Sequence, residues 1–224
     1  MRVVPFSGVK ETHVFAPNAP LPGSSSTDSQ PGTEAGLTGA AGVDFSDLYH
    51  IRPFRDADLG ACRSLYREGL LGGRLAENDS GLDVDDVRSA YLLDPRNGFW
   101  VAEVTRATHR FSQWLPEGTT PGTIVGMVGV QHHEEGVGEI RRLRVHPEHR
   151  RRGLGSRLLE SAIKFCRDNG SLKVQLDSYV DREEALKLFG RFGFRHSRTR
   201  SISGKDLLYF YLDLYTQDTS PEPR

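Results

Sequence analysis

One segment of the chain constrains its fold more than any other: a strand, a basic turn, and a helix that opens with glycine. Leu143–Pro147 has the pattern of a strand end closed by proline, and Arg150–Arg152 follows as three consecutive basic residues. A helix is predicted over 153–169, with Gly153 and Gly155 in its first turn. Its apolar positions form one stripe: Leu154, Leu158, Leu159, Ala162, Ile163 and Cys166. A strand that leads directly into an amphipathic helix is typical of a mixed α/β domain.

The start of this helix has the features of an anion-binding site. Glycine lets a ligand come close to the backbone, and the first N–H groups of a helix lie at the positive end of its dipole. Residues 140–167 contain nine Lys or Arg and two Glu, although the whole chain has a net charge of −1. The segment matches neither the GxxxxGK[ST] phosphate loop nor the GxGxxG dinucleotide pattern. It therefore predicts a pyrophosphate site of another kind, and a solvated basic connection is the alternative.

The hydrophobic pattern predicts the other elements in the order β α α β β β α β α β β. The strands are expected at 49–54, 99–104, 123–131, 139–146, 172–177, 194–200 and 206–215. The helices are expected from Asp56 onward and at 84–93, 153–169 and 182–192, with Asp56 and Asp83 as N-caps. Residues 105–122 form a long connection between two paired strands. We predict one mixed sheet in an α/β domain.

Composition sets the expected limits of this domain. Glu11–Ile51 contains no Lys or Arg and is rich in Gly, Pro, Ser, Thr and Ala. Such a stretch has too few large apolar side chains to offset the entropy of ordering the backbone. We expect a disordered or loosely docked tail over 1–48, a folded domain over 49–216 and a flexible C-terminal tail over 217–224.

The cysteines and the apolar runs indicate the compartment. Cys62 and Cys166 lie far apart, with no CxxC pair or His-rich spacing, which favours buried thiols over a disulfide or a zinc site. No apolar run approaches the ~18 residues of a membrane span, and the N-terminus has no charged-then-apolar signal pattern. We therefore expect a cytoplasmic protein that binds no membrane.

The basic turn also resembles a known family motif. Arg150–Gly155 reads Arg-Arg-Arg-Gly-Leu-Gly and matches the acetyl-coenzyme A motif of the GCN5-related N-acetyltransferase (GNAT) superfamily, Arg/Gln-x-x-Gly-x-Gly/Ala. Ala185–Phe194 resembles the late helix of that family, which ends in Gly-Phe, and the similarity covers His50 to Tyr215. Phe99–Glu103 and Val125–Gly129 are similar to the subgroup related to N-acetyltransferase 8, whose membrane segment we expect this chain to lack.

The resemblance implies a fold and a cofactor site. The fold would be a single mixed, mostly antiparallel sheet with about four flanking helices and an acetyl-CoA cleft where the central strands splay. Main-chain groups of Leu143, Arg144 and Val145 would pair with the pantetheine arm. The pyrophosphate would be bound by the turn and the helix start, which comprise Arg150, Arg151, Arg152, Gly153, Leu154, Gly155 and Ser156. No metal is expected.

The catalytic groups are less fully specified. The resemblance places the general base at Glu139, and the alternative is a strand-edge carboxylate paired with Arg141 or Arg144. His132 and His133 are further candidates for the base. The family's Asn and its general-acid Tyr correspond here to Arg182 and Phe189, and Phe cannot donate a proton. Water, a hydroxyl such as that of Tyr179 or Ser178, or no acid at all would then serve the leaving thiolate.

Two functions follow as hypotheses. The first is an acetyl-CoA-dependent N-acetyltransferase that transfers acetyl directly to a primary amine of a small molecule or a peptide. The alternative is a catalytically weak acyl-CoA-binding or sensing module, with Phe189 as the sign of lost chemistry. We expect no nucleic-acid partner, because the basic cluster lacks interleaved aromatic residues for base stacking. A homodimer is left open.

Overall fold

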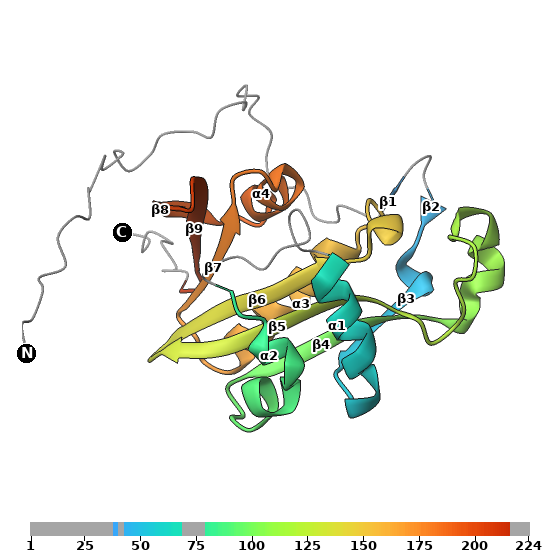
Figure 1. The fold of residues 1–224 in the computed structure, drawn as a ribbon, viewed down its shortest axis with the longest axis horizontal. Helices are drawn as coiled ribbons and strands as arrows, with labels where there is room; N and C mark the ends of the chain where they lie inside the picture. Colours follow the sequence, from blue (N-terminus) through green and yellow to red (C-terminus); the bar gives the residue numbers. More distant parts are fainter. Residues whose placement is uncertain (1–37, 40–42, 69–78, 216–224) are drawn as a thin grey trace, which may run out of the picture. The chain divides into compact units, whose positions relative to one another are not determined.

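The computed structural model describes residues 38–39, 43–68 and 79–215. Seven strands form one sheet in the order β3-β4-β5-β6-β7-β9-β8 (Figure 1). All neighbouring strands are antiparallel except β6 and β7. The strands are β3 (Tyr49–Pro53), β4 (Gly98–Val104), β5 (Ile124–Glu134), β6 (Val137–Val145), β7 (Lys173–Tyr179), β8 (Arg195–Ile202) and β9 (Lys205–Asp213). The predicted mixed, mostly antiparallel sheet is confirmed. A separate short pair joins β1 (Thr38–Gly39) and β2 (Val43–Asp44).

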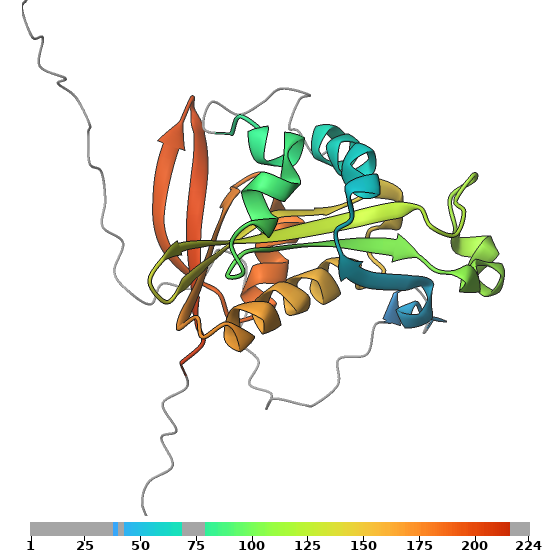
Figure 2. The same cartoon turned by 90° about the horizontal axis from the view of Figure 1, so that it is seen from below.

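Helices cover both faces of the sheet. Figure 2 shows α1 and α2 on one face of β4–β6 and α3 on the other. The α-helices are α1 (Leu59–Glu68), α2 (Leu82–Asp85), α3 (Leu154–Asp168) and α4 (Glu183–Arg191). Short 3-10 and π segments connect them: η1 (Ser46–Leu48), η2 (Asp56–Asp58), η4 (Arg88–Leu92), η5 (Arg106–Trp114) and η6 (Pro147–His149). In the part of the chain described here, no helix combines the length and apolarity needed to cross a membrane.

Each face of the sheet has its own hydrophobic core. All six residues of the predicted α3 stripe are buried, and they pack with residues of β5, β6, β7 and α4. The second core joins α1 and η4 to β4 and β5 through Leu65, Tyr91 and Met127. Cys62 and Cys166 are both free and buried, as predicted. Burial raises the pKa of the Cys62 thiol to about 12 and that of Cys166 to about 11.

Phe45 and Leu48, at the end of the expected tail, are buried in the α3-side core, so this end of the tail is docked on the domain. Three expectations about local structure need correction. Arg55, not Asp56, is the N-cap residue at the start of η2. The helix expected over 84–93 is instead α2 followed by the π-helical η4, and Gly81, not Asp83, occupies the N-cap of α2. Asp83 does not cap because its carboxylate accepts hydrogen bonds from side chains elsewhere. The predictions for residues 1–37 and 217–224 lie outside the described residues.

The two central strands separate soon after they pair. β6 and β7 pair in parallel only through Val137–Glu139 and Lys173–Gln175. Beyond this point β7 stays paired with β9, and Figure 2 shows the β7–β9–β8 part diverging from β4–β6. On β6 the register with β5 shifts next to Arg142, which has a positive φ of 57°. The second half of β6 therefore has an open edge on the side of β7.

Candidate active site

The open edge of β6 presents main-chain groups that no strand pairs. The N–H of His146 donates to the carbonyl of Val125 on β5 at 2.8 Å, so the main-chain groups of His146 point toward β5. Because these directions alternate along a strand, those of Val145 and Leu143 point into the gap beside β7. Arg144 Nη1 donates to the carbonyl of Leu143, and Arg150 Nε donates to that of Val145, each at 3.1 Å. An extended ligand with amide groups could hydrogen-bond to these two carbonyls in place of the Arg144 and Arg150 side chains.

The turn after β6 leads into the N-terminus of α3. Gly153 is the N-cap of α3 with a φ of 73°, a conformation that favours glycine, and the N–H of Arg157 donates to its carbonyl at 3.2 Å. The N–H groups of the residues between them belong to the first turn and point out of the helix end. A Cβ on Gly155 would find its nearest neighbouring atom, Leu188 Cδ2, at 3.5 Å, an ordinary contact. Packing therefore does not require glycine at 155, whereas the approach of a ligand would.

The three arginines of the turn differ in what they contact. Arg150 and Arg151 are exposed, and Arg151 forms an ion pair with Glu184 at the start of α4. Arg152 donates to the Tyr49 hydroxyl at 3.1 Å and to the main-chain carbonyl of Trp114, with its guanidinium 5.6 Å from the centre of the Phe45 ring. The side chain of Arg152 thus fixes the turn to the protein. We expect the two exposed arginines to supply positive charge and Arg152 to contribute through its main chain.

Glu139 lies where β6 and β7 begin to separate. It is the last β6 residue paired with β7, opposite Gln175, and its side chain is 22% exposed. His133 Nδ1 is 3.9 Å from its carboxylate. Arg141 donates instead to Gln131 Oε1 at 3.2 Å, and no ion pair joins Glu139 to Arg141 or Arg144 within the described chain. The structure therefore does not show Glu139 paired with an arginine, which was the alternative from the sequence.

A second carboxylate shares the neighbourhood of Glu139. Asp177 on β7 has a raised pKa, first because surrounding protein atoms remove part of its solvation and then because of the charge of Glu139. Tyr179, two residues further along β7, lies on the same face of the strand. The pKa of its hydroxyl is raised by partial burial and then by Asp177. These groups face the side of the sheet that α1 and α2 cover, since Leu176 and Val174 pack in the opposite core.

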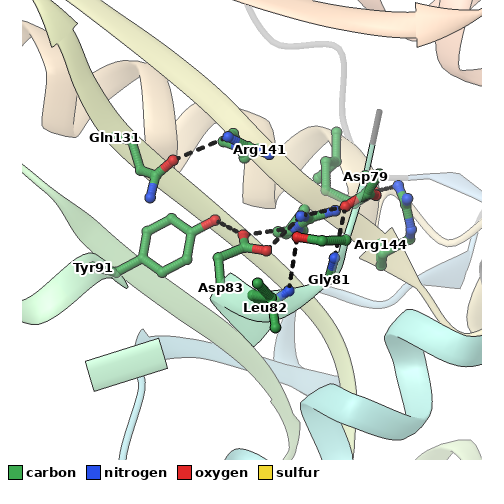
Figure 3. Close-up of polar contacts among 11 residues, drawn as sticks. Asp79, Gly81, Leu82, Asp83, Tyr91, Gln131, Arg141 and Arg144 are labelled. Atoms are coloured by element: carbon green, nitrogen blue, oxygen red, sulfur yellow. Dashed lines mark hydrogen bonds and ion pairs between the residues drawn. The ribbon is translucent and has the colours of Figure 1, made fainter. Parts of the chain in front are cut away.

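An ion cluster at the bulge of β6 was not found from the sequence. Arg142 is buried and donates to Asp79 at 2.6 and 2.7 Å and to Asp83 at 2.7 Å. The Tyr91 hydroxyl donates to Asp83 at 2.5 Å, and Figure 3 shows both carboxylates between α2 and β6. Burial alone would raise the pKa of both carboxyls, but the hydrogen bonds from Arg142 outweigh it and hold them below the usual value. The cluster connects the α1–α2 region to β6, the strand whose second half has an open edge.

The positions that correspond to the family's Asn and Tyr have other roles here. Phe189 is buried, and its ring centre lies 5.9 Å from those of Phe194 and Phe210. Phe189 packs beside two other aromatic rings, and this packing does not require a hydroxyl on its ring. Arg182 is the N-cap residue of α4 and is half-buried, and burial lowers the pKa of its guanidinium. The structure thus contains no hydroxyl at the position of the family's acid.

Comparison with known proteins identifies the family. Residues 66–194 match the family model described as Acetyltransferase (GNAT) family. The chain belongs to the GNAT family. It is 29% identical over 118 residues to human N-acetyltransferase 8, which covers 50% of this chain and 45% of the relative. It is 28% identical over 122 residues to the probable N-acetyltransferase camello of Xenopus tropicalis, which covers 54% and 48%.

The matches to this GNAT protein differ in extent. The N-alpha-acetyltransferase MAK3 of Arabidopsis thaliana is 36% identical over 97 residues, 43% of this chain and 47% of the relative. The chain spans about half the length of the curated relatives it matches. The GCN5-related N-acetyltransferase of Kribbella flavida superposes with a TM-score of 0.59 at 20% identity, covering 75% of this chain and 99% of that one. The putative acetyltransferase yncA of Salmonella typhimurium, solved with acetyl-CoA, gives 0.58 at 20%, covering 79% and 99%.

The site of this GNAT protein fits the coenzyme that its family uses. The open edge of β6 supplies polar main-chain groups for a pantetheine arm at Leu143 and Val145. The N-terminus of α3 and the arginines of the turn supply an anion site at the end of the same strand. The tolerance for a Cβ at Gly155 agrees with space kept for a ligand.

Proposed function

We propose that the protein is an acetyl-CoA-dependent N-acetyltransferase that transfers acetyl directly to a primary amine. The observation that carries this proposal is the open edge of β6, which ends at the glycine start of α3. Leu143 and Val145 would hold the pantetheine arm through their main chain, whereas the main chain of Arg144, between them, faces its partner Met127 on β5. The amides from Arg151 to Ser156 would hold the pyrophosphate. When bound, the coenzyme would supply an activated thioester carbonyl.

Glu139 is the proposed general base. An amine must lose a proton before or during attack on a thioester, and a carboxylate at the vertex of the two strands can accept it directly or through water. The amine would approach from the face covered by α1 and α2, where Glu139 and Asp177 both lie. Phe189 cannot donate a proton, so the leaving thiolate would take one from solvent or from a hydroxyl such as that of Tyr179 or of the buried Ser178 on β7. Thiols ionise near pH 8.5, so a thiolate is a tolerable leaving group without an acid.

The cysteines support direct transfer rather than an acyl-enzyme. A cysteine nucleophile acts as a thiolate in an accessible, electropositive setting. Cys62 and Cys166 are buried, and burial raises the pKa of both thiols well above neutral. Neither is suited to carry an acyl group.

The second candidate function is a catalytically weak acyl-CoA-binding or sensing module. The substitution of a hydroxyl by Phe189 and of an amide by Arg182 favours this reading. Both readings predict binding of the coenzyme, and only the enzyme predicts turnover.

The experiment measures binding and turnover separately. Calorimetry with acetyl-CoA tests the cofactor site, and release of free thiol with a panel of primary amines tests the reaction. Binding together with amine-dependent thiol release supports the enzyme. Binding without turnover across the panel supports the module, and the absence of binding contradicts both.

A further inference from the structure

Arg144 is a buried cation that the protein leaves almost unpaired. Its Nε is sealed from solvent and has no hydrogen-bond partner among the described residues. Its one hydrogen bond in that part of the chain runs from Nη1 to the carbonyl of the preceding Leu143. Arg142, two positions earlier, by contrast makes four hydrogen bonds to two carboxylates. Arg52 on β3 is likewise bound to both oxygens of Asp58.

Burying the Arg144 guanidinium with so few hydrogen-bond partners is energetically unfavourable. An unpaired charge inside a protein loses its hydration without gaining a counter-ion. Burial, followed by repulsion from Arg182 and Arg142, lowers the pKa of Arg144 to about 10, so the group still carries its charge at neutral pH. The residue as a whole keeps a partly accessible surface.

The position of Arg144 makes an anion there relevant to the reaction. Leu143 and Val145 pack in the core on the α3 side, so Arg144 between them points to the face covered by α1 and α2. Asp79 and Tyr66 on that face both act on its charge. This is the face from which we propose that the amine approaches. The arginines assigned to the pyrophosphate lie beyond the end of the strand.

We propose that Arg144 binds a carboxylate of a substrate, next to the point of acyl transfer. The inference rests on the proposed function and narrows its substrates. An arginine suits this task because its planar fork donates two parallel hydrogen bonds to a carboxylate. The carboxylate can belong to the acceptor, as in an amino acid, or to the acyl group, as in malonyl- or succinyl-CoA.

The test compares substrates that differ only in the carboxylate. Thiol release is measured with acetyl-CoA and matched acceptors: each amino acid, its amide, and the amine that remains when the carboxylate is removed. Succinyl-CoA and acetyl-CoA are compared with the uncharged amines. In one of these two comparisons, we expect kcat/KM to be at least tenfold higher for the substrate that carries the carboxylate. A preference among the acceptors places the carboxylate on the amine substrate, and a preference for succinyl-CoA places it on the acyl group.

Variants of the full chain connect the preference to this residue. Arg144→Met should remove the preference for the carboxylate, and Arg191→Met, at an exposed arginine at the end of α4, should keep it. Because the substitution removes an unpaired cation, the Tm of Arg144→Met without ligand should be unchanged or higher. The preferred carboxylate, added with coenzyme A, should raise the Tm of the wild type and not that of Arg144→Met.

Three results would overturn this inference. Equal kcat/KM for all matched pairs shows that no carboxylate is recognised. A loss of acetyl-CoA affinity in Arg144→Met without a change in preference assigns the residue to the coenzyme. A lowered Tm with loss of activity toward every substrate makes it structural. If no acceptor supports turnover, the proposed function fails, and the thermal shift with carboxylates still reports on Arg144.

Discussion

Arg142 neutralises two carboxylates at the bulge of β6 and so fixes α2 to this strand. Its side chain is 6% exposed, and those of Asp79 and Asp83 are 22% and 14% exposed. Arg142→Met leaves both carboxylates without a counter-charge. Removing one partner of a buried ion pair costs about 3–5 kcal/mol, and we expect a loss of that order in the free energy of unfolding, measured by urea denaturation.

A matched arginine separates this effect from the general cost of the substitution. Arg88→Met breaks a solvent-exposed pair with Asp56 at 3.1 Å and should change the stability far less. Similar losses in the two variants would show that the buried cluster contributes nothing special.

Glu139→Gln tests the proposed base. The substitution preserves size and removes basicity, so we expect kcat to fall by ~10²-fold or more if proton removal limits the rate. The acid limb of the pH profile should move or disappear, and the affinity for acetyl-CoA should hardly change. Glu135→Gln, at the exposed turn between β5 and β6, is the control and should behave as wild type. Full turnover with an unaltered profile in Glu139→Gln would move the role to His133, His132 or solvent.

At the scale of elements, the start of α3 is the part that coenzyme binding tests most directly. Replacing Gly153 and Gly155 by Val places side chains where the backbone should meet the ligand, and at Gly153 it also strains a φ of 73°. We expect the calorimetric Kd for acetyl-CoA to rise tenfold or more, which is about 1.4 kcal/mol. Gly60→Val on α1, where a Cβ meets nothing within 4 Å, is the control. An unchanged Kd in the double variant would show that the coenzyme does not bind at this turn.

The helices differ in how well the sequence predicts them. The α3 helix follows from its apolar period, because one face of an amphipathic helix must be buried wherever it packs. The 84–93 region has a similar apolar period but contains two short helices, α2 and η4. Asp83 in α2 accepts a hydrogen bond from Arg142, on a strand far away in the sequence. Pairings across such a distance depend on the register of β6, and its shift at Arg142 has no local sequence signal.

The candidate site divides in the same way. The strand, turn and glycines of the proposed coenzyme site are consecutive, so their order in the sequence is also their order in space. Arg142 and Arg144 stand in the same short run of arginines, and nothing in that run tells which one meets carboxylates and which one stays unpaired. The inward direction of Arg152 depends equally on Tyr49, about a hundred residues earlier.

At the scale of the whole molecule, two hydrophobic cores pack on opposite faces of one sheet. The α3-side core extends through Phe45 to the turn that precedes α3, because the Phe45 ring lies 5.7 Å from Phe111, 6.1 Å from Trp114 and under the guanidinium of Arg152. Phe45 and the turn before α3, where we propose that the coenzyme binds, are therefore parts of one packed unit.

This packing predicts where the chain can be shortened. A protein that starts at residue 36 keeps Phe45 and Leu48, and we expect it to retain the Tm and the acetyl-CoA affinity of the full chain. A protein that starts at residue 49 loses both side chains, whose exposed fractions are 4% and 0%. Full burial of such a side chain contributes about 1.5–3 kcal/mol, so the shorter protein should unfold at a clearly lower temperature.

The shorter protein should also bind acetyl-CoA more weakly, because Arg152 loses the ring beneath it at the start of the coenzyme turn. Phe45→Ala in the full chain is the matched variant, and it should reproduce part of both losses without removing any backbone. Differential scanning calorimetry and binding calorimetry on the three proteins measure the two effects side by side. Equal Tm and Kd values for the proteins that start at residues 36 and 49 would place the boundary of the domain after Leu48. A loss already present in the protein that starts at residue 36 would place it before that residue.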